Sequence, residues 1–372
     1  MSNGNLRLFA TDKDLFDLLV APRQRITERI MLELARDRRI FCSAQMTRHE
    51  LADYISSLPH DFQDVAGLIE KGEAGTRNER TTFVTVESND VVEADIRAAL
   101  TSYKASVGAS ERVTMPPSGA GVVFANVEYS DFDYSRTHLL QRQNRNAAVE
   151  FRVEDGRVRI RLPSTERAQE IVAAVVTELE RNKRATFTRN EISVSHLIPE
   201  LRSRFFLFLM GRMSEYKADT VTRLKVASSN STDEIADSEG GDDGVDAASA
   251  EMLHLVENVA LSGENLLASP QYRQLAESGF FITSMTWRAS QQVAPYDKVQ
   301  FDISFEDGKE GIGFRYLARV APRSSRDTYP QSFRLPTEAR KKELFETIEA
   351  AAHAALAAMQ NNIIPSKAQG DA

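Results

Sequence analysis

The chain of 372 residues is poor in cysteine and tryptophan, with one of each. The lone cysteine, Cys42, excludes an intramolecular disulfide and a cysteine-rich metal centre, and it favours a reducing compartment. The most apolar run, Phe205–Met210, is far shorter than the roughly 20 residues that span a bilayer. The N-terminus has no apolar segment after a basic start, so we expect no signal peptide. The sequence therefore predicts a cytoplasmic protein without a membrane partner.

Short catalytic motifs are also missing. The chain contains no GxSxG nucleophile elbow, no Walker loop, no Rossmann glycine pattern and no HExxH zinc motif. Gly119-Ala120-Gly121 follows two prolines, which is typical of a turn. The sequence therefore favours a non-catalytic protein, and we expect no cofactor.

The net charge of −8 comes from one segment. Subtracting its eight acids from the 54 of the chain leaves as many acids as there are Lys and Arg residues, 46. The charge balance of the remaining sequence therefore neither favours nor excludes a nucleic-acid partner. The eight acids are Asp233, Glu234, Asp237, Glu239, Asp242, Asp243, Asp246 and Glu251.

Changes in composition divide the chain into five parts and indicate the α+β class. Residues 1–115 predict a mostly helical N-terminal domain, followed by a first α+β unit over 116–226 and a second over 251–362. Between the two units, residues 227–250 are rich in Ser, Asp and Gly, which predicts an acidic flexible linker. Residues 363–372 predict a disordered tail.

Helical patterns dominate the N-terminal domain. Thr47 and Glu50 form a capping box before apolar residues at helical spacing, and a further helix is expected over 61–71. A strand over 81–87 follows. Three helices and a strand also suit a winged-helix transcriptional regulator, but the helix over 61–71 carries three acids and one lysine, which DNA phosphates repel. The sequence favours a structural or dimerising role and keeps the regulator as an alternative.

An internal similarity is the most informative feature. Residues 123–129 and 281–287 alternate like strands, and residues 149–156 and 299–308 both end in the hairpin signal Glu-Asp-Gly. Each copy then continues through a third strand and Arg-Leu-Pro into a helix. We predict a duplication of strand-strand-strand-helix units, each preceded by helical segments. These segments are Val91–Tyr103 in the first copy, and Met252–Leu261 with Tyr272–Glu277 in the second.

Arginines gather in the first of these units. A two-residue turn at Asp155-Gly156 predicts a hairpin in which Glu154 faces Arg157, and the next facing pairs are Arg152 with Arg159 and Glu150 with Arg161. A solvated, partly ion-paired face is one interpretation, and a phosphate-contacting strip is the other. The candidate nucleic-acid-binding residues are Arg136, Arg142, Arg145, Arg157 and Arg159.

Acidic residues follow the first strand of the same unit. Glu128, Asp131 and Asp133 are carboxylates of the kind that hold magnesium, although a polar loop at the end of a strand explains them as well. They keep open the alternative of a metal-dependent enzyme that acts on nucleic acid or phosphodiesters.

The function that the sequence favours is therefore a non-catalytic interaction subunit of an intracellular complex. It would bind a protein partner and, through the arginines, nucleic acid. The metal-dependent enzyme and the winged-helix regulator are the alternatives.

Overall fold

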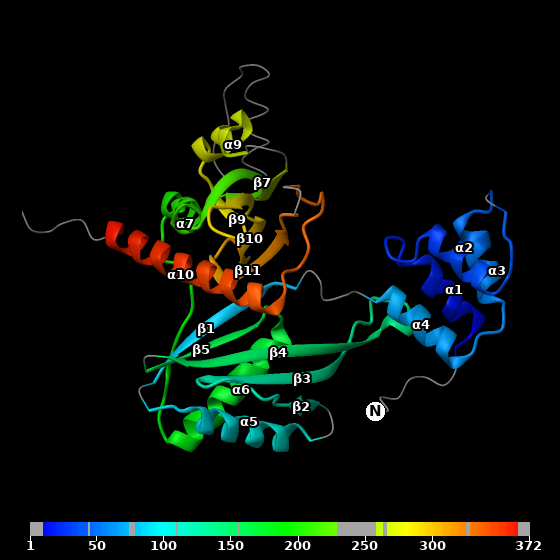
Figure 1. Cartoon of the computed structure of the whole chain (residues 1–372), viewed down its shortest axis with the longest axis horizontal. Helices are drawn as coiled ribbons and strands as arrows, with labels where there is room; N and C mark the ends of the chain where they lie inside the picture. Colours follow the sequence, from blue (N-terminus) through cyan, green and yellow to red (C-terminus); the bar gives the residue numbers. More distant parts are fainter. Residues whose placement is uncertain are drawn as a thin grey trace, which may run out of the picture. The chain divides into compact units, whose positions relative to one another are not determined.

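The structure is a computed structural model (Figure 1), and it describes residues 10–43, 45–73, 79–88, 90–108, 111–154, 156–228, 258–262, 266–324 and 328–363. For residues 258–262 and 362–363 it describes the backbone alone. The predicted linker apart from Ala227 and Ser228, and the predicted tail apart from Ile363, lie outside the described residues.

The chain forms two compact units. The small unit comprises residues 1–76, 100–117 and 125–148, and the large unit comprises residues 77–99, 118–124 and 149–372. Residues 77–99, which the sequence placed with the N-terminal helices, thus belong to the large unit. The division of the chain into five parts stays a prediction.

Four short helices build the core of the small unit: α1 (Asp12–Val20), α2 (Glu28–Asp37), α3 (Arg48–Ser56) and α4 (Phe62–Gly72). The capping box at Thr47 and Glu50 is confirmed at the start of α3. Leu18, Met31, Leu51 and Leu68 come from different helices and are all buried in one apolar cluster. The burial of these apolar side chains accounts for the stability of helices that are too short to persist alone.

The small unit also contains α4, which the regulator hypothesis takes as its reading helix. Asp61 caps the helix, and Asp64 accepts a hydrogen bond of 2.5 Å from Arg38. Leu68 packs into the core of the unit. Both the polar and the apolar side of α4 therefore contact the rest of the unit, and the regulator hypothesis stays untested.

The helices and one large antiparallel sheet confirm the α+β class. Neighbouring strands follow the order β2-β3-β4-β5-β1-β11-β10-β9-β7-β8, and β6 pairs with β1. The strands are β1 (Thr81–Glu87), β2 (Arg112–Thr114), β3 (Val122–Phe132), β4 (Arg142–Glu154), β5 (Arg157–Pro163), β6 (Thr188–Asn190), β7 (Tyr216–Ser228), β8 (Asn258–Ser262), β9 (Phe280–Gln291), β10 (Lys298–Asp307) and β11 (Ile312–Ala321). The other elements are α5 (Glu93–Val107), η2 (His138–Leu140), α6 (Glu166–Lys183), α7 (Pro199–Arg212), η4 (Leu266–Ala268), α9 (Pro270–Glu277) and α10 (Glu338–Ile363).

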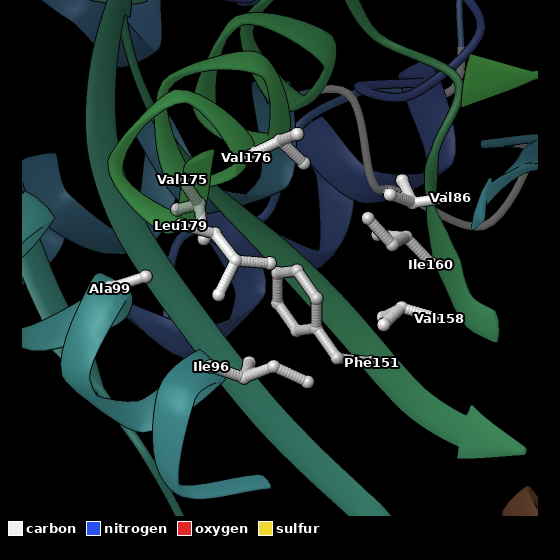
Figure 2. Close-up of a pocket in the computed structure, with 9 residues that line it drawn as sticks. All are labelled: Val86, Ile96, Ala99, Phe151, Val158, Ile160, Val175, Val176 and Leu179. Atoms are coloured by element: carbon white, nitrogen blue, oxygen red, sulfur yellow. The ribbon is translucent and has the colours of Figure 1, made fainter. Parts of the chain in front are cut away.

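Helices α5 and α6 cover one face of β4, β5 and β1 in the large unit. Figure 2 shows apolar side chains of both helices and of the three strands around Phe151. The cavity between them holds about 10 Å³, and all of its lining side chains are apolar. A water molecule needs about 10–15 Å³ and polar partners, so this space is dry packing and not a ligand site.

Helices α7 and α10 cover the opposite face. Ile160 of β5 points to the α5–α6 side, whereas the next residue, Arg161, contacts Glu349 of α10. Successive side chains of a strand point to opposite faces, so α6 and α10 lie on different sides of the sheet. Figure 1 shows α7 and α10 to one side of β9, β10 and β11. The apolar run Phe205–Met210 lies in α7, and Phe205, Phe206 and Leu209 are buried there.

Three strands followed by a helix recur in both segments where the sequence predicted them. The first set is β3, β4, β5 and α6, and the second is β9, β10, β11 and α10. The sets run through the sheet in opposite orders, on either side of β1, and their helices lie on opposite faces. The duplication itself stays a prediction.

The prediction of a helix over Met252–Leu261 is wrong for residues 258–261, the part of this range that the structure describes. Residues Asn258–Ser262 form β8, which pairs with β7 in antiparallel register from Arg223↔Ser262 to Ala227↔Asn258. The hydrogen bonds offered by β7 decide this conformation, and they are not visible in the local pattern. At the other end of the predicted linker, Ala227 and Ser228 are buried residues of β7.

A buried ion-pair network joins α10 to the first hairpin. Arg161 donates two hydrogen bonds to Glu349, of 2.7 and 3.0 Å, and Glu349 also accepts one from the Tyr316 hydroxyl. Glu349 is only 1% exposed, and Tyr316 is fully buried. Next to this cluster, Arg152 bridges Glu150 at 2.7 Å and Glu346 of α10 at 2.5 Å. The guanidinium groups of β4 and β5 therefore anchor the C-terminal helix.

We expect Glu349→Gln to lower the free energy of unfolding by about 2–4 kcal/mol, because it removes the buried carboxylate that Arg161 bonds and leaves that arginine paired with Glu150 alone. Urea unfolding followed by circular dichroism measures the loss. The matched control is Glu33→Gln, whose partner Arg29 has an 88% exposed side chain. This control is expected to lose about 0–1 kcal/mol. Equal losses in the two variants would contradict an anchoring role of the buried pair.

Candidate nucleic-acid interface

The predicted hairpin register is confirmed, and it places the hairpin arginines in unequal surroundings. β4 and β5 pair Glu154 with Arg157, Arg152 with Arg159, and Glu150 with Arg161. The Arg157 side chain is 64% exposed, with Glu87 4.0 Å away. Arg159 lies 3.6 Å from the buried carboxylate of Glu349. Of the two candidate residues in the hairpin, Arg157 is thus the more accessible.

The other candidate arginines belong to the small unit and have partners there. Arg136 bonds Asp133 at 2.8 Å, and Arg142 donates to the Ser130 hydroxyl at 3.1 Å. Arg145 donates to the side-chain oxygen of Gln143 at 2.5 Å. These contacts hold the three side chains along the ends of β3 and β4.

The structure does not gather the predicted metal ligands. Glu128 faces Arg112 across the β2–β3 pair, with 3.8 Å between their charged groups. Asp133 bonds Ser135 and Arg136, and these contacts lower the pKa of its carboxyl group. Among the residues that the structure describes, no three His, Cys, Asp or Glu side chains converge as metal ligands would. Asp131 therefore belongs to no such cluster. The metal-dependent enzyme stays an untested alternative.

A row of cations lies on the sheet face opposite α7 and α10. Trp287, Phe301 and Tyr316 of β9, β10 and β11 point into the core below those helices. Alternation along each strand and the register between strands place the intervening residues on the other face. We call this surface the basic face, and its cations are Lys217, Arg223, Lys225, Arg288, Lys298, Arg315 and Arg319.

The cations of the basic face outnumber its acids. Asp302 bonds Arg80 at 3.0 Å, and Glu306 lies 3.7 Å from Arg315. Burial lowers the pKa of the Arg315 guanidinium, and repulsion from Arg80 lowers it further, while Glu306 acts in the opposite direction. Burial and the neighbouring Arg80 thus disfavour the positive charge of Arg315.

The most exposed cations lie on β7 and β9. Lys217, Arg223, Lys225 and Arg288 are all exposed. Within the described part of the chain, none of these four forms an ion pair with a carboxylate. Arg223 and Lys225 lie two residues apart on one face of β7, so their backbones are about 7 Å apart. These side chains are available to an anionic partner.

Aromatic rings border the basic face at the corner where the β9–β10 turn meets the segment after β11. Lys298 lies over the Tyr329 ring, 4.8 Å from its centroid, and Arg288 lies over Phe333 at 5.5 Å. Arg323 lies over Tyr296 at 5.5 Å. We call Tyr296, Tyr329 and Phe333 the aromatic corner. Because Arg288 and Lys298 of the basic face lie over Phe333 and Tyr329 of the aromatic corner, the face and the corner are adjacent.

Local sequence patterns do not reveal this surface as a whole, although a signal for β7 is present. Arg223-Leu224-Lys225-Val226 alternates base and apolar residue just as Arg157-Val158-Arg159-Ile160 does. Such alternation predicts a half-buried strand with a basic outer face. Arg223 lies in β7 and Arg288 in β9, and a long stretch of sequence separates these two strands. The face that they share is therefore a product of tertiary structure.

Comparison of the sequence with protein-family models and with curated proteins finds no match. None of the helices in the described ranges combines the length and the apolar character needed to cross a bilayer.

Tyr296 has a left-handed backbone, with φ of 60°. This conformation costs an L-residue about 1–2 kcal/mol, and asparagine tolerates it better than tyrosine. Since the Tyr296 side chain is 46% exposed, we expect Tyr296→Asn to leave the free energy of unfolding unchanged or to raise it by up to about 1 kcal/mol.

Chemical denaturation of the two proteins measures this difference. Tyr54→Asn is the matched control, because Tyr54 is 40% exposed but lies within helix α3. It is expected to lose stability, since asparagine is a poorer helix former in the middle of a helix. A larger loss for Tyr296→Asn than for Tyr54→Asn would show that folding requires the Tyr296 ring.

Proposed function

We propose that the protein is a non-catalytic nucleic-acid-binding protein of the cytoplasm and that the basic face is its binding surface. The observation that carries the proposal is the set of exposed cations on β7 and β9, Lys217, Arg223, Lys225 and Arg288, on a sheet face turned away from the covering helices.

The chemistry of the face suits a phosphate backbone. Lys and Arg side chains neutralise phosphates and release condensed counterions, which supplies most of non-specific nucleic-acid affinity. Gln300 pairs with Arg288 on one side and with Arg319 on the other and is partly exposed, and amide groups also bond phosphate oxygens. Contacts of this kind position a strand without reading its sequence.

This surface differs from the hairpin that the sequence favoured. Arg159 and Arg161 of the hairpin contact the buried Glu349, so their charges are compensated inside the protein. Arg223 and Lys225 of the basic face have no such carboxylate among the described residues. Uncompensated charge favours the basic face as the partner of a polyanion.

We expect Arg223→Glu/Lys225→Glu to weaken binding to a single strand of about 20 nucleotides by more than about tenfold at low salt. The slope of log K against log salt concentration is expected to become shallower by about 0.7 for each phosphate that the variant no longer neutralises. Fluorescence anisotropy of a labelled strand, titrated at several salt concentrations, measures both quantities. The weakening is expected to be alike for unrelated sequences, because side chains that bind phosphate do not read bases.

The charge-matched control is Arg29→Glu/Arg157→Glu, which reverses two exposed arginines away from the basic face. It is expected to bind within about twofold of the original protein, since every cation of the basic face is still present. If this control loses binding and the β7 variant does not, the hairpin is the interface. If a folded sample of the original protein binds no strand at low salt, the proposed function is wrong.

A second candidate function is binding of a protein partner, which one observation in the small unit favours. Phe132 and Tyr134 are 53% and 79% exposed, and their rings stack with 6.3 Å between centroids. Exposed aromatic pairs are typical of protein-binding surfaces. Replacing both by serine should remove a bound partner in quantitative copurification. Phe41→Ser, at a side chain that is 91% exposed, is the matched control and should retain it.

A further inference from the structure

The aromatic corner adds a feature that phosphate binding alone does not require. Tyr296 is 46% exposed and Tyr329 is 36% exposed, so part of each ring is open to solvent. The cations Arg323 and Lys298 lie over these rings. A cation over one side of a ring leaves the other side available for stacking.

The backbone of the corner holds the two tyrosines in place. The Tyr329 hydroxyl donates to the backbone oxygen of Tyr296 at 3.0 Å. Asp297 is 7% exposed, and it accepts a 3.0 Å hydrogen bond from the backbone N–H of Arg323. The left-handed conformation of Tyr296 is also unfavourable for a tyrosine. The corner thus holds a large, partly exposed ring in a backbone conformation that is unfavourable for tyrosine.

A protein that places aromatic rings next to cations that bind the nucleic-acid backbone can distinguish paired from unpaired bases. In a duplex the faces of the bases are stacked inside the helix, so a protein ring reaches them only after unstacking. In a single strand the bases can turn outward and stack on aromatic side chains while the phosphates follow a basic groove. Every base has a flat face, so such stacking tolerates all sequences.

We infer that the protein binds unpaired strands in preference to duplexes, with bases stacked on Tyr296 and Tyr329 and the phosphates along the basic face. This inference rests on the proposed function, because the basic face supplies the backbone contacts. DNA and RNA strands share the chemistry that the site recognises.

The experiment compares four labelled probes of equal length in anisotropy titrations: a DNA single strand, an RNA single strand, a DNA duplex, and a DNA strand with abasic sites. The original protein is expected to bind the two single strands about tenfold or more tightly than the abasic strand, which keeps the phosphates but lacks the bases. It is also expected to bind them more tightly than the duplex.

Tyr296→Ala/Tyr329→Ala is expected to weaken single-strand binding by about tenfold or more, and to leave duplex and abasic binding within about twofold. Tyr296→Phe keeps the ring and should retain single-strand binding. Circular dichroism melts of each variant confirm that it is folded. Tyr54→Ala removes a tyrosine that is 40% exposed in the small unit and should change no probe.

The outcomes separate this inference from the proposed function. Absence of binding to every probe by the folded protein overturns both. Binding that depends on Arg223 and Lys225 but is the same for single, abasic and paired strands overturns the stacking inference and leaves the proposed function in place. Loss of only the DNA or only the RNA signal in the tyrosine variants would show that the corner recognises the sugar and not the base, which also overturns the stacking inference.

Discussion

The buried pair of Arg161 and Glu349 is the interaction on which the arrangement of the large unit depends. It joins side chains that are 188 residues apart, one in β5 and one in α10. Burial and the hydrogen bond to Glu349 raise the pKa of Tyr316 well above its usual value, so its hydroxyl stays protonated and donates to the carboxylate. Charges this deep are tolerated only with their partners present, which ties the last helix to the first hairpin.

Anchoring α10 on this face decides what the rest of the sheet exposes. Tyr316 and Phe345 form an edge-to-face ring contact between β11 and α10, with 4.9 Å between centroids. With Tyr316 turned toward the helix, alternation turns Arg315 to the other side of β11. The register between neighbouring strands then places Arg288 and Arg223 on the same side of the sheet as Arg315. The basic face is therefore a consequence of where the C-terminal helix packs.

Sequence patterns identified the features that depend on neighbouring residues. The capping box at Thr47, the strand over Thr81–Glu87 and the register of the Arg157 hairpin are all set by a few adjacent side chains, and all are confirmed. The segment Asn258–Ser262 was wrongly expected to be helical, because its state depends on pairing with β7. The arginines of β5 were correctly placed on one face, but their carboxylate partner in α10 lies far along the chain.

The sequence by itself determined the α+β class, the strands of the two similar segments and the pairing within the first hairpin. These follow from side-chain periodicity and turn chemistry, which act over a few residues. Only the tertiary structure decided that Arg161 is buried and Arg223 exposed, although both alternate with apolar neighbours in the same way. The pattern along a strand specifies two faces but not which one a helix covers. The helix that covers the Arg161 face comes from the other end of the chain.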